Sequence, residues 1–193
     1  MRSFLLVLAM LVVAGCSSGT ADFRGTDITG ASFGRDFALN DTSGRQRTLA
    51  DYRGKVVVMF FGFTHCPDVC PGALAKLAEA RRKLGEDGDR VQGLFVTLDP
   101  ERDTPELLAQ YVPAFDPSFV GLRGDAAATE RVAKEFKVFY QKSPGATPDS
   151  YSIDHSAQMF LFDAEGRLRL FVSHNQDADA LAHDLRELLR TSG

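Results

Sequence analysis

The sequence predicts an α/β fold built around one central β-strand that is covered on both faces. Apart from Met59 and Gly62, residues 56–63 are β-branched or aromatic, with almost no alternation, which is typical of a strand without a solvated side. Leu74, Leu77 and Leu84 then recur on one side of a helical wheel, and residues 91–98 form a second apolar run. A strand, a helix and a strand in this order form a βαβ unit, so we expect the two strands to be parallel.

Composition limits the number of domains and the classes of partner. A chain of 193 residues with 44% hydrophobic and 25% charged residues can bury one full core. The net charge is -4, and no basic block of the kind that follows phosphates is present. We therefore expect a single-domain monomer that does not bind nucleic acid.

The N-terminus predicts export and a lipid anchor. Arg2 precedes an apolar stretch over residues 4–13, which is too short to span a bilayer. Val13-Ala14-Gly15-Cys16 follows and resembles a bacterial lipobox, in which cleavage precedes a lipidated cysteine; an ordinary signal peptide with an incidental cysteine is the alternative. We expect a membrane-anchored lipoprotein whose domain lies in the periplasm or otherwise outside the cytoplasmic membrane. Its parts are a signal peptide (1–15), the lipidated Cys16, a flexible tether (16–30) and the folded domain (31–193).

Further elements flank the central pair of strands. Residues 33–49 predict a hairpin around Asp-Thr-Ser-Gly at positions 41–44, which adds an edge to the sheet. Thr104 and Pro105 suit the N-cap and first residue of a helix that reaches about Val112. A short strand at residues 119–122 and a helix marked by Ala128, Val132 and Phe136 are expected next.

The C-terminal third predicts a loop, a hairpin and a helix. Residues 141–154 contain two prolines and no periodicity, and predict a long loop that leads to His155. Strands at 159–162 and 168–172 pair through a tight turn, and Asp177 or Asp179 caps the last helix. The complete order of elements predicts a thioredoxin-like α/β sandwich with an added N-terminal β-hairpin.

Two cysteines, each followed by a proline, come directly after the central strand. Because a proline disfavours helical conformation in the residue before it, we expect a tight turn over Cys66-Pro67-Asp68-Val69-Cys70 and a regular helix from Pro71. Such a turn brings the two sulfurs close enough to form a disulfide or to bind one ion, and nearby helical N–H groups favour the thiolate. A purely structural disulfide is the less favoured interpretation, since so short a loop restrains little chain entropy.

Acidic residues follow the second strand at Asp99, Glu101 and Asp103. They predict either a polar docking surface beside the cysteines or ordinary solvated charges, and the sequence leaves both interpretations open.

Three stretches together, FGFTHCPDVCP, TLDPERDTP and SIDHSAQMFLFD, resemble the Sco/SenC family of copper-binding proteins. The resemblance covers about residues 33–189. It implies a membrane-anchored, thioredoxin-like protein that helps to metallate the binuclear copper centre of cytochrome c oxidase. By position, the family's copper ligands correspond to Cys66, Cys70 and His155. The implied partners are the copper-accepting oxidase subunit and other copper carriers or thiol reductants.

The chemistry of these three side chains agrees with the resemblance. Two thiolates and an imidazole suit copper as Cu(I) or Cu(II), whereas a structural zinc site normally has four protein ligands. His65, His174 and His183 are assigned no metal role. The first hypothesis is therefore a copper metallochaperone, a transfer protein rather than a catalyst.

Two other activities remain open. The first is a thiol-disulfide oxidoreductase that uses Cys66 and Cys70 to keep a client's cysteines reduced, although thioredoxin-type enzymes use a shorter C-x-x-C spacing. The second is a peroxidase, which the FTHCP stretch suggests, but a distant resolving cysteine is lacking if Cys16 is lipidated.

Overall fold

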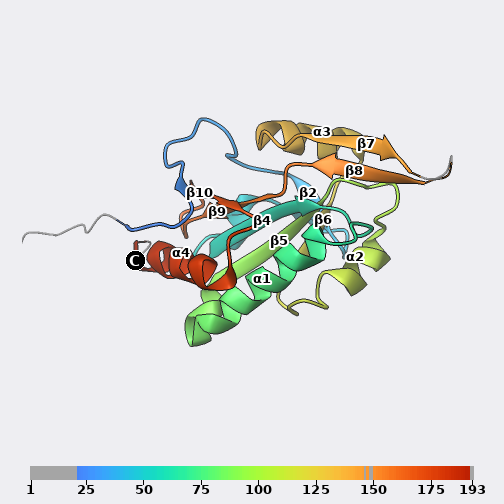
Figure 1. The fold of residues 1–193 in the computed structure, drawn as a ribbon. Coiled ribbons are helices and arrows are strands. Elements are labelled where there is room, and N and C mark those ends of the chain that lie inside the picture. Colours follow the sequence, from blue (N-terminus) through green and yellow to red (C-terminus); the bar gives the residue numbers. More distant parts are fainter. Residues whose placement is uncertain (1–20, 146, 148–149, 192–193) are drawn as a thin grey trace, which may run out of the picture.

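The computed structural model describes residues 21–145, 147 and 150–191, which form one eight-stranded sheet with helices on both faces (Figure 1). Three strands at its centre run parallel, β4 (Val56–Gly62), β5 (Val91–Thr97) and β6 (Val120–Arg123). The other strands pair antiparallel. They are β1 (Thr26–Asp27), β2 (Leu39–Asp41), β3 (Gln46–Arg47), β9 (Gln158–Phe162) and β10 (Leu168–Ser173), and the order across the sheet is β1-β10-β9-β4-β5-β6-β2-β3.

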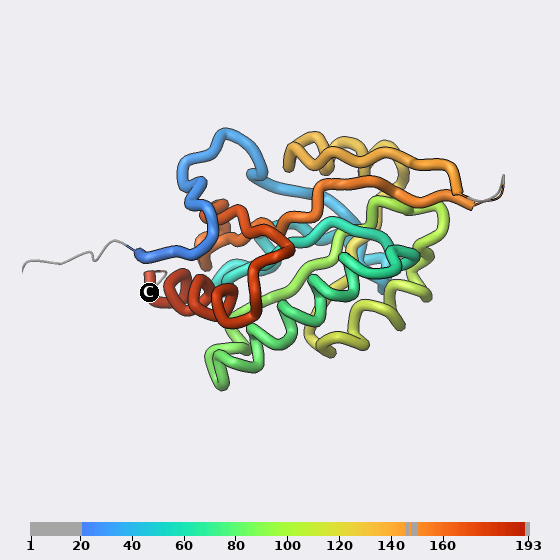
Figure 2. The backbone as a smooth tube through the Cα atoms, viewed as in Figure 1, coloured from blue at the N-terminus to red at the C-terminus, as the bar shows by residue number. Residues whose placement is uncertain are grey.

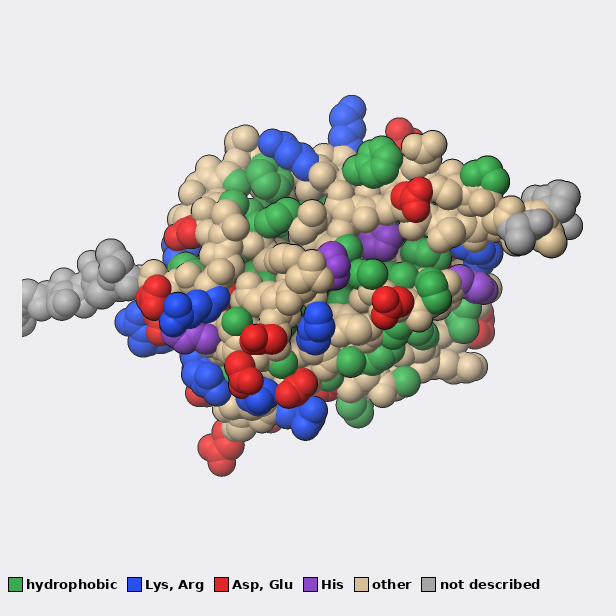
Figure 3. Space-filling view, viewed as in Figure 1, with side chains coloured by type: hydrophobic (Ala, Val, Ile, Leu, Met, Phe, Trp, Pro, Cys, Tyr) green, Lys and Arg blue, Asp and Glu red, His purple; other side chains and the backbone are tan. Residues whose placement is uncertain are grey.

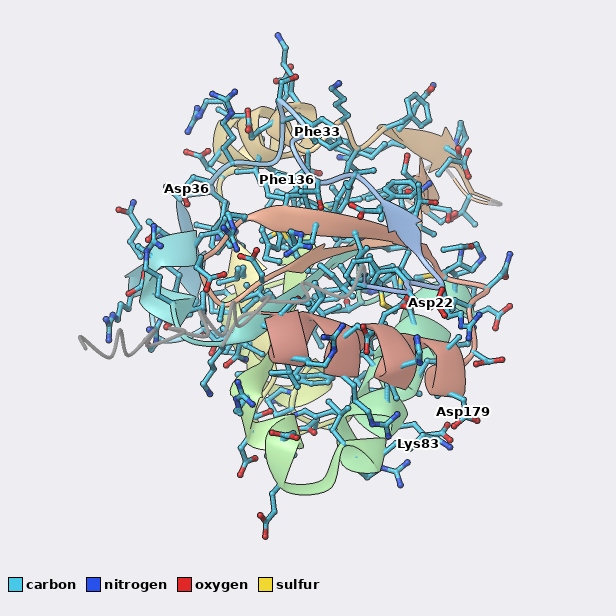
Figure 4. The ribbon with its side chains drawn as sticks, turned by 90° about the vertical axis from the view of Figure 1, so that its left-hand side faces the viewer. Asp22, Phe33, Asp36, Lys83, Phe136 and Asp179 are labelled. Carbon is cyan, nitrogen blue, oxygen red and sulfur yellow. The ribbon has the colours of Figure 1, made fainter. Side chains whose placement is uncertain are left out.

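The helices lie in two layers. One face of the sheet carries α1 (Val69–Lys83), α2 (Pro105–Tyr111) and α4 (Ala178–Thr191), and the other carries α3 (Ala126–Glu135) (Figures 1 and 2). In Figure 4, Lys83 and Asp179 lie together at the side of α1 and α4, and Phe136 lies on the opposite side of the sheet. Two short 3₁₀ helices, Leu49–Tyr52 and Gly85–Arg90, complete the connections.

The central strand is buried on both faces, as the sequence predicts. Every residue of β4 is buried, and its side chains alternate between two cores. Val58 and Phe60 pack with α1 and α4, while Met59 and Phe61 pack on the side of Phe136. Because both faces are covered by helices, the strand needs no polar alternation.

Most of the predicted boundaries agree with the structure. The N-terminal hairpin forms between β2 and β3, and Thr104 caps α2 by accepting a hydrogen bond from the Leu107 N–H at 3.2 Å. Asp177, not Asp179, caps α4, since its carboxylate accepts from the Ala180 N–H at 2.8 Å.

The start of α1 differs from the prediction. The helix begins at Val69, two residues before Pro71, so Cys70 is helical despite the proline that follows it. Pro71 is the third residue of the helix, where its missing N–H has no intrahelical partner to lose. Full burial of Cys70 against the core outweighs the weak local preference of a residue before proline.

The predicted long loop at residues 141–154 is wrong. Most of it forms a separate two-stranded hairpin, β7 (Tyr140–Pro144) with β8 (Tyr151–His155), in which His155 ends the second strand. The hairpin follows α3 in the chain and lies beside it (Figure 2). Its strands are mostly polar and contain one buried apolar residue, Ile153, so the sequence shows little hydrophobic alternation.

The predicted tether over residues 16–30 extends too far into the domain. Phe23 packs against the core, and β1 pairs with β10 through Thr26 and Phe171. The N–H groups of Arg24 and Gly25 donate to the buried carboxylate of Asp184 at 2.6 and 2.9 Å. The folded domain therefore begins before residue 31, because these residues pair with the edge strand β10 and donate hydrogen bonds to the buried carboxylate of Asp184.

The predictions for the signal peptide and for Cys16 concern residues 1–20, which lie outside the described part of the chain. Among the helices that the structure describes, none combines the length and the apolar character needed to cross a membrane.

Candidate metal centre

The two cysteines occupy a turn and a helix start at the carboxyl end of β4. After Phe63 the chain turns, with the Cys66 N–H donating to the Phe63 carbonyl at 3.2 Å. Cys66 is half-buried, and Cys70, the second residue of α1, is fully buried. Both are free thiols, and the Cys70 N–H points to the Cys66 sulfur at 3.4 Å. The turn thus places the Cys66 sulfur beside the backbone of Cys70.

Gly62, the last residue of β4, makes room for the Cys70 sulfur. A Cβ atom added at this position would lie 2.8 Å from Cys70 Sγ and 2.9 Å from the Phe95 ring. Side chains do not tolerate contacts this short, so glycine is required for the close approach of the thiol to the strand.

His155 reaches the buried thiol from the end of β8. Its Nε2 atom lies 3.7 Å from Cys70 Sγ, and its Nδ1 atom lies 2.8 Å from the Ser156 carbonyl oxygen. Because a carbonyl oxygen only accepts, Nδ1 carries the proton and the neutral ring turns the Nε2 lone pair toward the sulfur. The edges of Phe60 and Phe63 pack against the imidazole, with ring centroids 6.3 and 5.9 Å away.

Burial keeps both contacting groups neutral. Removal from solvent raises the pKa of the Cys70 thiol far above its usual range, and the same effect lowers the pKa of His155. At neutral pH the thiol can therefore donate to Nε2 as S–H, and an ion that binds the sulfur must displace this proton.

The spacing of the Cys70 and His155 ligand atoms fits a shared metal ion. Metal–sulfur and metal–nitrogen bonds of about 2.3 and 2.0 Å, at trigonal to tetrahedral angles, separate the two ligand atoms by roughly 3.5–3.8 Å. The observed separation is 3.7 Å. Within the described residues, no group of three or more histidine, cysteine, aspartate and glutamate side chains is arranged as a complete metal site.

An open hollow gives access to these residues. It has a volume of about 260 Å³, and Phe63, Cys66, Pro67, Val69, Ile153 and His155 are among the residues that line it. A larger hollow of about 410 Å³ between residues 29–35 and 166–168 is lined by no cysteine or histidine, so we place the chemistry at the smaller one. Figure 3 shows histidine side chains lying among hydrophobic ones near the middle of one face of the molecule.

Two of the three acidic residues after β5, Asp99 and Asp103, have a structural role. The sequence predicts either a docking surface or solvated charges, and neither interpretation anticipates this role. Asp99 and Asp103 are both fully buried, whereas Glu101 is exposed. The Asp103 carboxylate accepts from the Thr64 N–H at 3.1 Å and from the Thr64 and Thr97 hydroxyls at 2.5 Å. It therefore holds the turn that leads into the cysteine segment. Threonines at the ends of two parallel strands were the available sequence signal for this network.

The remaining histidines make other contacts, although His174 lies near enough to His155 to help lower its pKa electrostatically. The exposed His65 ring lies 3.1 Å from the Thr64 hydroxyl, and His183 on α4 contacts the Asp22 carbonyl at 2.7 Å. His174 accepts a hydrogen bond from Lys76 through its backbone carbonyl.

The fold and the site define a thioredoxin-like protein with two thiols after the central strand and a histidine that reaches one of them from the β7–β8 hairpin. The SCO1/SenC family model matches residues 25–190, and the chain belongs to this family. The mitochondrial SCO2 homolog of Bos taurus is 40% identical over 153 residues, which cover 78% of this chain and 58% of the relative. The chain thus spans little more than half the length of such curated relatives.

Two solved structures share the fold at substantial identity. ScoI of Bradyrhizobium japonicum with copper bound is 38% identical, with a TM-score of 0.74 and coverage of 82% of this chain and 100% of that one. The apo Sco1 protein of Thermus thermophilus is 43% identical, with a TM-score of 0.79 and coverage of 89% and 99%.

Proposed function

We propose that this protein is a copper carrier that binds one copper ion through Cys66, Cys70 and His155. The observation that carries the proposal is the 3.7 Å contact between Cys70 Sγ and the unprotonated Nε2 of His155. Two soft sulfur ligands and one imidazole favour copper, and three protein ligands leave the ion open to exchange. The open hollow beside Cys66 supports exchange with a partner's ligands.

The proposed recipient is the copper-accepting subunit of cytochrome c oxidase. Sco proteins take part in copper binding and in cytochrome c oxidase assembly. We further propose that residues 1–15 are a signal peptide and that Cys16 is the lipid anchor that holds the domain outside the cytoplasmic membrane.

Anaerobic Cu(I) titration of the reduced domain from residue 21 onward tests the carrier proposal. We expect one tightly held equivalent and much weaker binding in His155→Ala. Oxidation of the Cys66 and Cys70 thiols to a disulfide in the same variant is the control, since it does not need the imidazole. Equal copper affinity in His155→Ala contradicts the proposed ligand set.

A second candidate function is reduction of a client disulfide, and the close pair of free thiols favours it. The more accessible Cys66 thiolate attacks one client sulfur and forms a mixed disulfide, releasing the other client sulfur as a thiol. Cys70 then loses its proton, attacks Cys66 and releases the second client thiol, which leaves a Cys66–Cys70 disulfide. The client gains two electrons and two protons in total.

Trapping tests this second function directly. Cys70→Ser should accumulate the mixed disulfide with a peptide that carries the client's cysteine pair, whereas Cys66→Ser should not. Failure of the wild-type dithiol to reduce that peptide excludes the reductase activity and leaves the carrier proposal untouched.

A further inference from the structure

The strand that carries His155 directs three alternate side chains toward the domain. Tyr151, Ile153 and His155 lie two residues apart on β8, so they share one face of the strand. Ile153 is buried in the same core cluster as Cys70, and His155 contacts the Cys70 sulfur. The position of the imidazole therefore depends on what holds this face of β8 against the domain.

Tyr151 makes the most extensive of these contacts. Its hydroxyl donates to the buried carboxylate of Asp99 at 2.7 Å, and the Arg102 Nε donates to the other carboxylate oxygen at 2.5 Å. Arg102 also donates to the Tyr151 carbonyl at 2.9 Å and stacks 3.6 Å above the centre of the ring. We call Asp99, Arg102 and Tyr151 the Tyr151 latch.

The latch is important because the hairpin has few other attachments. Strands β7 and β8 form a sheet of their own and have no ladder partner in the main sheet within the described residues. An exposed pair between Lys142 and Glu101 at 2.7 Å adds little, because solvent screens it. Among the polar side-chain contacts that the described part of the hairpin makes with the rest of the domain, two reach fully buried partners: Tyr151 contacts Asp99, and His155 contacts Cys70.

The latch also connects the two halves of the metal centre. Asp99 and Arg102 belong to the same short loop as Asp103, which holds the turn before the cysteines through Thr64. One loop after β5 therefore contacts both the cysteine segment and the strand of His155. We therefore expect a displacement of this loop to change the distance between the thiols and the imidazole.

We propose that Tyr151 is a positioning residue for His155: by holding β8 on the Asp99–Arg102 loop, it sets the imidazole at bonding distance from a metal on Cys70. The proposal rests on the proposed copper function, and it adds a residue that itself contacts neither the metal nor the thiols. When the contacts of Tyr151 with Asp99 and Arg102 are lost, His155 moves away and only the sulfurs of Cys66 and Cys70 remain as ligands.

The test is a double-mutant cycle between Tyr151→Phe and His155→Ala, read by Cu(I) competition. Tyr151→Phe removes one hydrogen bond to a buried carboxylate and keeps the ring under Arg102, so we expect about a tenfold loss of affinity. In the His155→Ala background the same change should alter affinity less than about twofold, because the positioned ligand is absent. Tyr140→Phe on the neighbouring strand is the matched control and should leave affinity unchanged.

A measurement without metal separates this proposal from the copper function. Hydrogen exchange of the β8 amides in the metal-free protein should accelerate about tenfold in Tyr151→Phe, while exchange in β4 stays constant. If Tyr151→Phe folds poorly, Arg102→Lys serves as the second variant. It keeps the positive charge beside Asp99 but loses the guanidinium plane that stacks on Tyr151, so it should also weaken Cu(I) binding and accelerate exchange of the β8 amides.

Two results overturn the latch. One is wild-type affinity and exchange in Tyr151→Phe; the other is an equal loss of affinity with and without His155, which indicates a general structural effect. Failure of the wild-type protein itself to bind copper contradicts the proposed function instead, and faster β8 exchange in that case still supports the latch.

Discussion

At the scale of single residues, the site is a contact between two groups that burial keeps uncharged. The Cys70 thiol and the His155 imidazole meet at 3.7 Å, and the Ser156 carbonyl fixes which imidazole nitrogen carries the proton. A buried thiol with a raised pKa is a poor nucleophile but a good metal ligand once the ion displaces its proton. The proposed binding of copper is therefore coupled to proton release.

This coupling predicts that copper affinity increases with pH. Below its raised pKa Cys70 is protonated, so each unit of pH from 6 to 8 should strengthen Cu(I) binding by at least about tenfold. Because burial lowers the pKa of His155 below its usual value, imidazole protonation does not oppose binding over this range. Competition against a Cu(I) chelator of known pH dependence measures the slope. A flat profile is incompatible with a protonated Cys70.

A second prediction concerns Gly62. Gly62→Ala places a methyl group 2.8 Å from Cys70 Sγ, and we expect a loss of about 1–3 kcal/mol in the free energy of unfolding. Gly72→Ala on α1 is the control, since no atom lies within 4 Å of its new Cβ, and it should stabilise the protein by up to about 1 kcal/mol. Urea unfolding of the reduced proteins compares them. Equal effects at both positions would show that the close approach of the thiol is unimportant.

At the scale of elements, the loop over residues 99–103 contacts both the turn that leads to the two cysteines and the strand that carries His155. Asp103 holds the turn after β4, and Asp99 holds β8. Buried carboxylates that accept several hydrogen bonds are costly to leave without them, so the loop restrains both segments.

Asp103→Ala tests this restraint. The change leaves the Thr64 N–H and the Thr97 hydroxyl without their acceptor, at about 1–3 kcal/mol for each unpaired group. We expect a lower free energy of unfolding and faster exchange of the Thr64 to Cys66 amides. Glu101→Ala, two residues away and exposed, should stay within about 0.5 kcal/mol of the wild type. Similar results for the two variants would remove the assigned role of Asp103.

The sequence predicts elements well where burial alone decides them. The uninterrupted apolar run predicts β4 and the helical periodicity predicts α1, and the parallel arrangement of β4 and β5 follows from connectivity. The β7–β8 hairpin is not predicted, because its stability comes from distant partners such as Asp99 rather than from hydrophobic alternation. For the same reason the candidate ligands could be named from motifs, whereas the network that positions them could not.

At the scale of the whole molecule, the segment that leads to the proposed membrane anchor is part of the sheet. β1 covers the edge of β10, and the backbone at Arg24 and Gly25 satisfies the buried Asp184. The segment at residues 24–27 and the Cys70–His155 site therefore belong to one folded unit.

Truncation tests the importance of this segment. A chain that starts at residue 31 loses both N–H donors to Asp184 and the packing of Phe23, and we expect it to be less stable by at least about 2 kcal/mol than a chain that starts at residue 21. Thermal and urea unfolding give the difference. Equal stability of the two chains would restore the domain boundary at residue 31.

X-ray absorption spectroscopy of the Cu(I)-loaded domain tests the central claim most directly, because it counts the atoms bound to copper. We predict two sulfur neighbours and one nitrogen neighbour in the wild type, and loss of the nitrogen with retention of both sulfurs in His155→Ala. A nitrogen contribution that persists in His155→Ala, or fewer than two sulfurs in the wild type, would contradict the site formed by Cys66, Cys70 and His155.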